Sequence, residues 1–109
     1  MRFVLAIISI IAATIQIRAE LPFAQVQTSL FSVPNSLSNV WGDYDNDGDL
    51  DLAVSIGTGE IRLYRNDKGL LVSVGAEMGM PQQGQEFRGL SWGDYDGDGF
   101  LDLLGGATE

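Results

Sequence analysis

The sequence contains neither cysteine nor histidine among its 109 residues. A disulfide scaffold, a Cys/His zinc site and catalysis by a cysteine nucleophile or a histidine base are therefore excluded. Basic residues are scarce as well: six lysines and arginines accompany 15 aspartates and glutamates, which gives a formal net charge of −9. We expect no nucleic-acid partner, because binding to phosphates requires a basic surface. A chain of this length supports one small domain.

The one long apolar run of the sequence lies at its N-terminus. Met1 and Arg2 precede it, residues 3–15 are apolar apart from one serine and one threonine, and Ala19 follows. These features are typical of a secretory signal peptide, and an uncharged stretch of about 15 residues is shorter than the roughly 20 that a membrane-spanning helix needs. We expect residues 1–19 to be a signal peptide and the protein to be secreted, extracellular or periplasmic, without a membrane span after cleavage. A membrane anchor and a buried helix are the alternatives.

A twelve-residue motif occurs twice in the remaining chain. Residues 41–52 read WGDYDNDGDLDL and residues 92–103 read WGDYDGDGFLDL, so that ten of the twelve positions are identical at an offset of 51 residues. Self-similarity at a period of this size is typical of propellers, solenoids and repeat arrays. A tandem pair of independent metal hairpins is the alternative.

Short segments of β character surround the two copies and are separated by glycine-rich turns. Strands are predicted at residues 52–56, 61–65, 70–74 and 88–92, with strand character also at residues 23–33. Residues 75–85 contain four glycines or prolines and are predicted to form a loop. The predicted fold class is therefore all-β, with one or more antiparallel blades of a β-propeller. Trp41 and Trp92 are expected to anchor the cores of these blades.

The two motif copies place acidic residues at alternate positions of a loop. They occupy positions 1, 3, 5 and 9 of the pattern D-x-D-x-D-G-x-x-D, namely Asp43, Asp45, Asp47 and Asp51 in the first copy and Asp94, Asp96, Asp98 and Asp102 in the second. Ca²⁺ prefers six to eight hard oxygen ligands at about 2.3–2.6 Å, and a curled loop with alternate carboxylates supplies them. Each loop is therefore predicted to bind one Ca²⁺ ion. A solvated acidic turn is the alternative, and Mg²⁺ is disfavoured because it retains water ligands.

The other positions of each loop fit the same interpretation. Glycine at position 6 permits a sharp turn, and position 7, which is Asp49 or Phe100, is expected to offer its backbone carbonyl oxygen. An EF-hand is excluded because position 12 is Val54 or Gly105 rather than glutamate and because the flanking segments have strand character. We expect the strand after Asp102 to be cut short and barely to begin, whereas the strand after Asp51 is complete. The first loop is therefore expected to bind Ca²⁺ more tightly.

Both motif copies resemble the FG-GAP/VCBS repeat of integrin-α-type β-propellers. The stretch LYRND at residues 63–67, followed by a glycine turn, resembles bacterial secreted VCBS proteins and the ASPIC/UnbV group related to cartilage acidic protein. The resemblance covers residues 37–105 and implies a β-propeller, usually of seven blades, with one Ca²⁺ in each acidic loop. Together with the N-terminal pattern, it gives the expected domain organisation: 1–19 signal peptide, 20–36 N-terminal strand segment and 37–109 repeat region. One period and the start of a second do not close a ring, so the chain is expected to be part of a longer propeller that supplies the remaining blades.

These observations favour a secreted, calcium-binding and non-catalytic module that binds an extracellular protein or polysaccharide. Without residues 1–19 the chain would hold four basic and 15 acidic residues, a net charge of −11 that calls for a compensating cation. The alternative is the propeller part of a secreted carbohydrate-active or other enzyme. A purely structural segment is the third interpretation.

Overall fold

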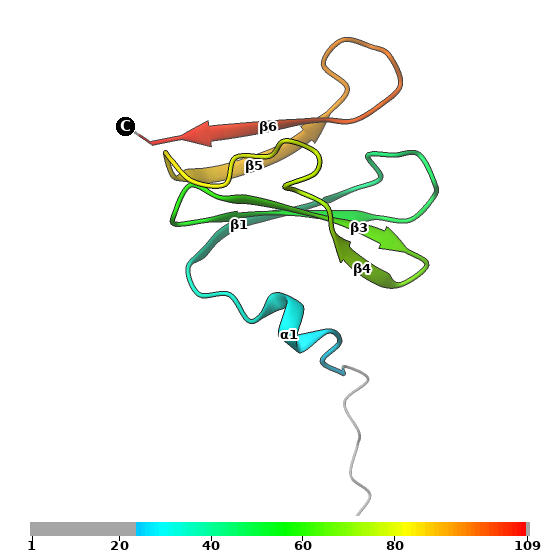
Figure 1. The fold of residues 1–109 in the computed structure, drawn as a ribbon. Helices are drawn as coiled ribbons and strands as arrows, with labels where there is room; N and C mark the ends of the chain where they lie inside the picture. Colours follow the sequence, from blue (N-terminus) through cyan, green and yellow to red (C-terminus); the bar gives the residue numbers. More distant parts are fainter. Residues whose placement is uncertain (1–23, 109) are drawn as a thin grey trace, which may run out of the picture.

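The computed structural model describes residues 24–108, and its regular structure consists mainly of six strands in two antiparallel sheets (Figure 1). The first sheet has the order β1-β2-β3-β4 and the second pairs β5 with β6. The strands are β1 (Ser36–Gly42), β2 (Asp51–Ile56), β3 (Ile61–Asp67), β4 (Leu70–Ser73), β5 (Phe87–Gly93) and β6 (Asp102–Ala107). The predicted all-β class is confirmed.

The predicted signal peptide at residues 1–19 lies outside the described residues. Within residues 24–108, no helix has the length and apolar character that crossing a membrane requires.

The sequence repeat is also a structural repeat. Both ends of β5 lie 51 residues after the ends of β1, and both ends of β6 lie 51 residues after those of β2. Even the register shift at the start of the first pair recurs in the second. The expectation that the strand after the second loop barely begins was wrong: β6 has six residues, as β2 does, and pairs with β5 along its length.

Strand β3 and the turn that follows it show why the first sheet forms. Apolar Ile61 and Leu63 are buried on one face of the strand, whereas Arg62 between them lies on the other face and is partly exposed, as alternation along a strand requires. The two-residue turn to β4 consists of Lys68 and Gly69, both with positive φ (54° and 92°). Two such residues form the turn whose twist matches that of the flanking strands, so this hairpin follows from local chemistry.

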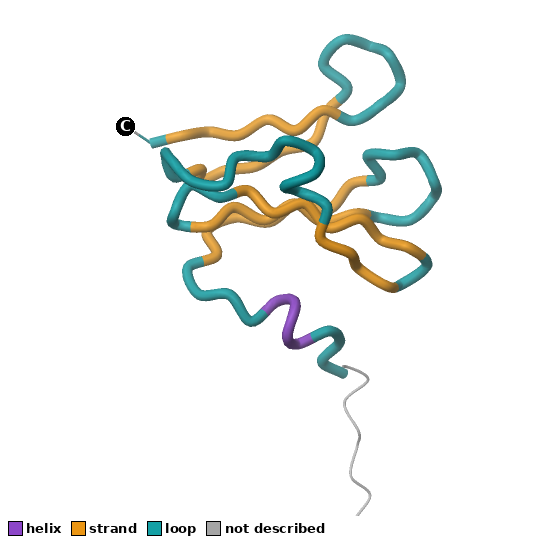
Figure 2. Tube along the Cα trace, in the orientation of Figure 1, coloured by secondary structure: helices purple, strands orange, loops and turns teal. Residues whose placement is uncertain are grey.

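The second sheet stacks on one face of the first, and the hydrophobic core lies between them (Figures 1 and 2). Ala53, Leu63 and Val74 form the buried cluster on the first sheet. Leu90 and Trp92 pack against it from β5, and Leu103 from β6. Stacking of two sheets through alternate side chains is the arrangement by which antiparallel sheets bury their apolar faces.

The segment at residues 23–33, for which the sequence predicts strand character, packs on the first sheet through its described residues. In the described part of residues 23–33, the structure contains the one-turn helix α1 (Thr28–Phe31) and no strand. The Phe31 ring packs on Tyr64 with ring centroids 5.2 Å apart. The side chain of Gln27 donates to the Leu71 carbonyl (2.8 Å) and accepts from the Leu71 amide (2.9 Å). Side-chain contacts with the sheet thus replace backbone pairing, which explains why the strand prediction was wrong.

The two motif tryptophans differ in environment. Trp92 is half-buried in the core between the sheets, and its indole Nε1 donates to the Val40 carbonyl at 3.3 Å. Trp41 is 51% exposed, which corrects the expectation that it anchors a core. The reason is that the Trp41 side of the sheet faces α1, whereas the Trp92 side of the second sheet faces the first sheet.

A matched pair of glycines tests this stacking. A Cβ at Gly42 would lie 2.6 Å from Trp92 Cδ1, whereas a Cβ at the equivalent Gly93 would meet nothing within 4 Å. We expect Gly42→Ala to lower the free energy of unfolding by about 1–3 kcal/mol through overpacking. Gly93→Ala should change it by less than about 0.5 kcal/mol. Urea denaturation followed by circular dichroism measures both, and equal effects would contradict the described position of Trp92.

Candidate metal centre

The two acidic loops lie at the same end of the stacked sheets. The first joins β1 to β2 and the second joins β5 to β6, and both extend in the same direction in Figure 1. This follows from the repeat, because the second sheet stacks on the first with β5 against β1. The fold therefore presents two sites of the same design side by side.

Three carboxylates of each loop converge. One oxygen from each of Asp43, Asp45 and Asp51 lies within 4.8 Å of the other two, and Asp94, Asp96 and Asp102 form the same arrangement. These residues occupy positions 1, 3 and 9 of the pattern. The structure thus brings together three of the four acidic side chains predicted as ligands in each loop. Asp47 and Asp98 at position 5 are not members of these groups of three.

The carboxylate at position 1 organises each loop. Asp43 Oδ1 accepts from the Asp47 amide (3.0 Å) and Asp43 Oδ2 from the Gly48 amide (2.9 Å). Asp94 makes the equivalent contacts in the second loop, with the Asp98 amide at 3.0 Å and the Gly99 amide at 2.9 Å. Short acidic side chains favour such local bonds to the backbone, and they curl the loop around its first residue.

Glycine at position 6 and the acidic residue at position 5 complete the curl. Gly48 and Gly99 have φ values of 93° and 90°, in the left-handed region that glycine enters most readily. Asp47 Oδ1 then accepts from the amide of position 7 at 2.9 Å, as does Asp98 Oδ1 in the second loop. The carboxylates at position 5 therefore hold the backbone of position 7, whose carbonyl oxygen is the predicted ligand. That ligand role, for Asp49 and for Phe100, stays a prediction.

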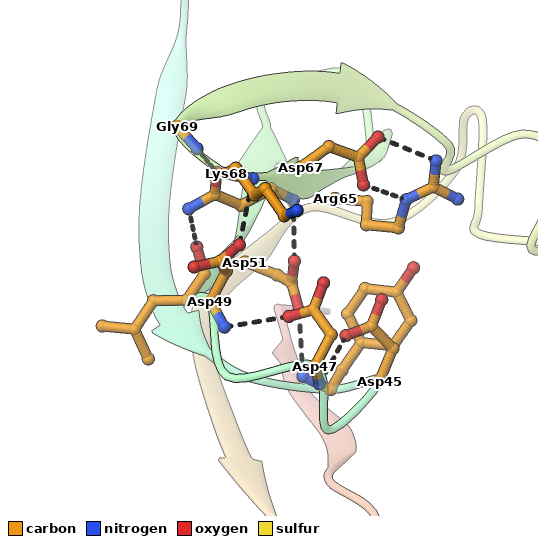
Figure 3. Close-up of polar contacts among 11 residues, drawn as sticks. Asp45, Asp47, Asp49, Asp51, Arg65, Asp67, Lys68 and Gly69 are labelled. Carbon is orange, nitrogen blue, oxygen red and sulfur yellow. Dashed lines mark hydrogen bonds and ion pairs between the residues drawn. The ribbon is translucent and has the colours of Figure 1, made fainter.

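Asp51 at position 9 is the fully buried member of the first site, with a relative exposure of 0%. Its Oδ2 accepts from the Tyr44 amide (3.0 Å), and its Oδ1 accepts from the Asn66 amide (2.8 Å). Figure 3 shows this carboxylate between the loop and the end of β3. A buried carboxylate is stable only when its oxygens are hydrogen-bonded, and these two amides meet that requirement.

Asn66 is the functional residue that sequence reasoning missed, because it was interpreted only as a turn residue. Besides donating its amide to Asp51, it donates its side chain to the Leu50 carbonyl (2.9 Å) and accepts from the Gly69 amide (2.7 Å). It thus ties the end of the acidic loop to the β3–β4 hairpin. The signal that could have found it is its position directly before the Asp-Lys-Gly turn, 15 residues after Asp51.

Asp49 has a side chain that serves the hairpin rather than the carboxylate cluster. Its Oδ2 accepts from the Lys68 amide at 3.0 Å, across the turn between β3 and β4 (Figure 3). Two loop carboxylates, those of Asp49 and Asp51, therefore hold the same hairpin. This agrees with a position 7 at which the side chain itself is not needed as a ligand.

The second site lacks this support. Asp102 is exposed, and its Oδ2 accepts from the Tyr95 amide at 2.8 Å, as Asp51 does from Tyr44. Within residues 24–108, the second sheet has no third strand that would donate an amide as Asn66 does. The prediction that the first loop binds Ca²⁺ more tightly therefore does not rest on strand length. It rests on the burial and support of the residue at position 9.

Negative charge is concentrated in the first site. The pKa of Asp45 is raised, first by burial and then by the charges of Asp51 and Asp47. Arg65 of β3 forms an ion pair with Asp67, with 2.9 Å between Nε and Oδ1, and this bond lowers the pKa of Asp67. Arg62 and Arg88 pair with glutamates two residues away in the same manner. None of the three ion pairs in the described range therefore involves a loop carboxylate.

Fold and site together define a class, the all-β repeat proteins with acidic loops between strands. Comparison with known protein families matches residues 43–105 to the FG-GAP-like repeat, which is more than half of the chain. The chain therefore belongs to the FG-GAP-like repeat family, as its resemblance indicated. The match spans both acidic loops and the four strands β2, β3, β4 and β5 between them, and it specifies no subgroup. No curated protein and no solved structure matches the chain.

The different support of position 9 in the two loops generates a prediction that needs no metal. Asp51→Ala leaves two backbone amides without an acceptor, one of them inside the sheet, and we expect a loss of about 1–3 kcal/mol in the free energy of unfolding. Asp102→Ala removes the same chemical group from an exposed position, and we expect a loss of less than about 1 kcal/mol. Urea denaturation in the presence of a chelator measures both. Equal losses would show that burial does not distinguish the two loops.

Proposed function

We propose that this protein is a calcium-binding FG-GAP-like repeat module that acts outside the cytoplasm and binds a protein or polysaccharide rather than catalysing a reaction. The observation that carries the proposal is the convergence of three carboxylates in each of two loops. Membership of the FG-GAP-like repeat family supports it, because such repeats often bind calcium.

The chemistry of the donor set fits Ca²⁺. All side chains of the two clusters are carboxylates, which are hard oxygen ligands, and nitrogen and sulfur ligands are lacking because the chain has no histidine or cysteine. Asp43, Asp45 and Asp51 would hold the ion in the first loop, and Asp94, Asp96 and Asp102 in the second. Asp47 and Asp98, the carbonyl oxygens of Asp49 and Phe100, and water would supply the remaining ligands. The pKa of Asp45 is raised first by burial and then by the charges of Asp51 and Asp47, and a bound cation would offset both effects.

The outer face of the second sheet supports the proposal that further propeller blades cover it. In the first sheet, the place next to Gly42 and Tyr44 is filled by Trp92, whose ring stacks on Tyr44. The equivalent place in the second sheet is a depression of about 480 Å³ lined by Gly93, Tyr95 and Leu104. Tyr95 is 93% exposed and Leu104 is 72% exposed. Large exposed apolar surface of this kind is typical of an interaction face, and a further repeat would fill it as Trp92 fills the first.

The non-catalytic part of the proposal is supported by the use of the acidic residues. Of the four acidic residues that lie outside the acidic loops in residues 24–108, Glu60, Glu86 and Asp67 are each paired with an arginine two residues away. The fourth, Glu77, is a single exposed carboxyl group. The clustered aspartates are assigned to the metal. General acid–base catalysis by a pair of carboxyl groups requires one of them to be free and held neutral near the operating pH.

Calcium binding is tested by titrating the full chain with Ca²⁺ in a calorimeter. We expect saturable binding of two ions in the range of about 10⁻⁴–10⁻³ M that is typical of extracellular modules. Asp45→Ala removes a carboxylate from the first cluster and should abolish one of the two sites. Ca²⁺ should also raise the melting temperature, because binding to the folded state alone stabilises it.

Asp49→Ala is the matched control for this experiment. It removes the same charge from the same loop, but its side chain is bonded to the Lys68 amide rather than placed in the cluster. We expect it to lower the Ca²⁺ affinity of the first site by less than about threefold, as for a charge interaction near the surface. An absence of saturable binding at millimolar Ca²⁺ would refute the calcium assignment. Equal effects of the two substitutions would refute the assigned ligand set.

Export is tested by the N-terminus of the protein recovered from a secreting host. We expect the chain to begin at or near Glu20, because Ala19 ends the predicted signal peptide. N-terminal sequencing or intact mass measurement reports this directly. Soluble protein that retains residues 1–19 would contradict export.

A further inference from the structure

The two acidic loops contact each other through one side chain. Asn46 of the first loop donates from its Nδ2 to the carbonyl of Gly99 in the second loop at 3.0 Å, across 53 positions of sequence. Asn46 occupies one of the two positions at which the motif copies differ, and the second copy has Gly97 there. The contact thus joins the loops through a residue that the repeat does not share.

The backbone at this position does not require asparagine. Asn46 has a φ of 59° and Gly97 a φ of 76°, so both lie in the left-handed region. Glycine enters that region without steric cost, and asparagine is tolerated there. What asparagine adds in the first loop is a side-chain donor that reaches the neighbouring loop.

The acceptor of this bond belongs to a peptide group that is held from both sides. The Gly99 carbonyl accepts from Asn46, and the amide of the same peptide group, that of Phe100, donates to Asp98 Oδ1 at 2.9 Å. The next carbonyl along the chain, that of Phe100, is the predicted position 7 ligand of the second site. Asn46 therefore helps to orient the backbone segment that would complete the second site.

A second contact connects the same two loops at their bases. The rings of Tyr44 and Trp92 stack with centroids 6.1 Å apart and an interplanar angle of 9°. The Tyr44 amide donates to Asp51 of the first site, and Trp92 lies two residues before Asp94 of the second. The stacking thus holds the bases of the two loops side by side and keeps Asn46 within reach of Gly99.

We propose that the two loops form a coupled pair, in which Asn46 is a positioning residue that transmits calcium occupancy from one loop to the other. The proposal rests on calcium binding as the function of the loops. An ion in the first loop restrains the backbone that carries Asn46, and this lowers the entropic cost of ordering the second loop around its own ion. Because coupling between two binding sites is reciprocal, an ion in the second loop raises the affinity of the first by the same factor.

A cycle of variants of the full chain measures the coupling. Asp45→Ala disables the first loop and Asp96→Ala, at the equivalent position, disables the second. We expect Asp45→Ala to lower the Ca²⁺ affinity of the second loop about three- to tenfold, the range expected for one net hydrogen bond. Asp96→Ala should lower the affinity of the first loop by the same factor.

Asn46→Gly identifies the residue that carries this coupling. We expect each loop of this variant to bind Ca²⁺ still, but adding Asp45→Ala or Asp96→Ala should no longer weaken the remaining loop. The variant should fold, because glycine occupies the equivalent position of the second loop. Gly97→Asn is the matched control; it adds the same side chain where no contact between the described loops depends on it, and it should leave the coupling factor unchanged.

Amide hydrogen exchange in a chelator provides a readout without calcium. We expect exchange in residues 94–101 to be faster in Asn46→Gly than in the unmodified chain, with residues 61–73 unchanged. If both loops bind Ca²⁺ independently, or if the coupling survives Asn46→Gly, the coupling proposal is refuted and the proposed function is not. A chain that binds no Ca²⁺ at either loop would refute the proposed function and the coupling together.

Discussion

The buried carboxylate of Asp51 is the contact on which the rest of the first repeat depends. It joins a loop and a hairpin that are distant in sequence, through the Tyr44 amide on one oxygen and the Asn66 amide on the other. A carboxylate has lone pairs beyond those used by two amides, so it can hold the backbone and still face a cation. The same group therefore stabilises the fold and shapes the candidate metal site.

The second repeat shows what the shared sequence does without that support. Strands β5 and β6, the curled loop and the Tyr95–Asp102 contact reproduce the first repeat with an offset of 51 residues. Asp102 is nevertheless exposed, because the described part of the second sheet ends with β6. Local sequence thus determines the loop, whereas the burial of position 9 depends on the strands beyond it.

Stacking of the two sheets is what brings the loops together. Trp92 fills the space beside Gly42, where a side chain would collide with it, and stacks on Tyr44. This places the base of the second loop against the first and lets Asn46 reach Gly99. The repeat therefore does more than duplicate a site. The core between the sheets also fixes the position of one site relative to the other.

Much of this arrangement was predictable from the sequence, because its signals are local. Alternation of apolar residues and the glycine turns predicted β2 to β5, and the spacing of the aspartates predicted the curled loops. The glycines at position 6 adopt the left-handed backbone that this prediction required.

The remaining features depend on contacts between distant segments. Residues 23–33 were expected to have strand character, but their described part contains α1, and Phe31 packs on Tyr64. Packing on the sheet outweighed a weak local preference for strand. Trp41 and Trp92 are each followed by Gly-Asp-Tyr-Asp, and their different burial comes from the stacking of the sheets rather than from this shared motif. The role of Asn46 could not be predicted for the same reason, because it bonds to a residue 53 positions away. Asn66 had a local signal in the turn that follows it, but its bond to Asp51 spans 15 positions.

The most direct test of this account is the anomalous scattering of crystals of the full chain grown with Tb³⁺ or Ca²⁺. The account predicts an ion in the first loop bound by Asp43, Asp45 and Asp51, with Asp51 still accepting from the Tyr44 and Asn66 amides. An equivalent ion is predicted at Asp94, Asp96 and Asp102. Loops without an ion at saturating concentration would contradict the account, as would an ion bound only after Asp51 has left its two amides.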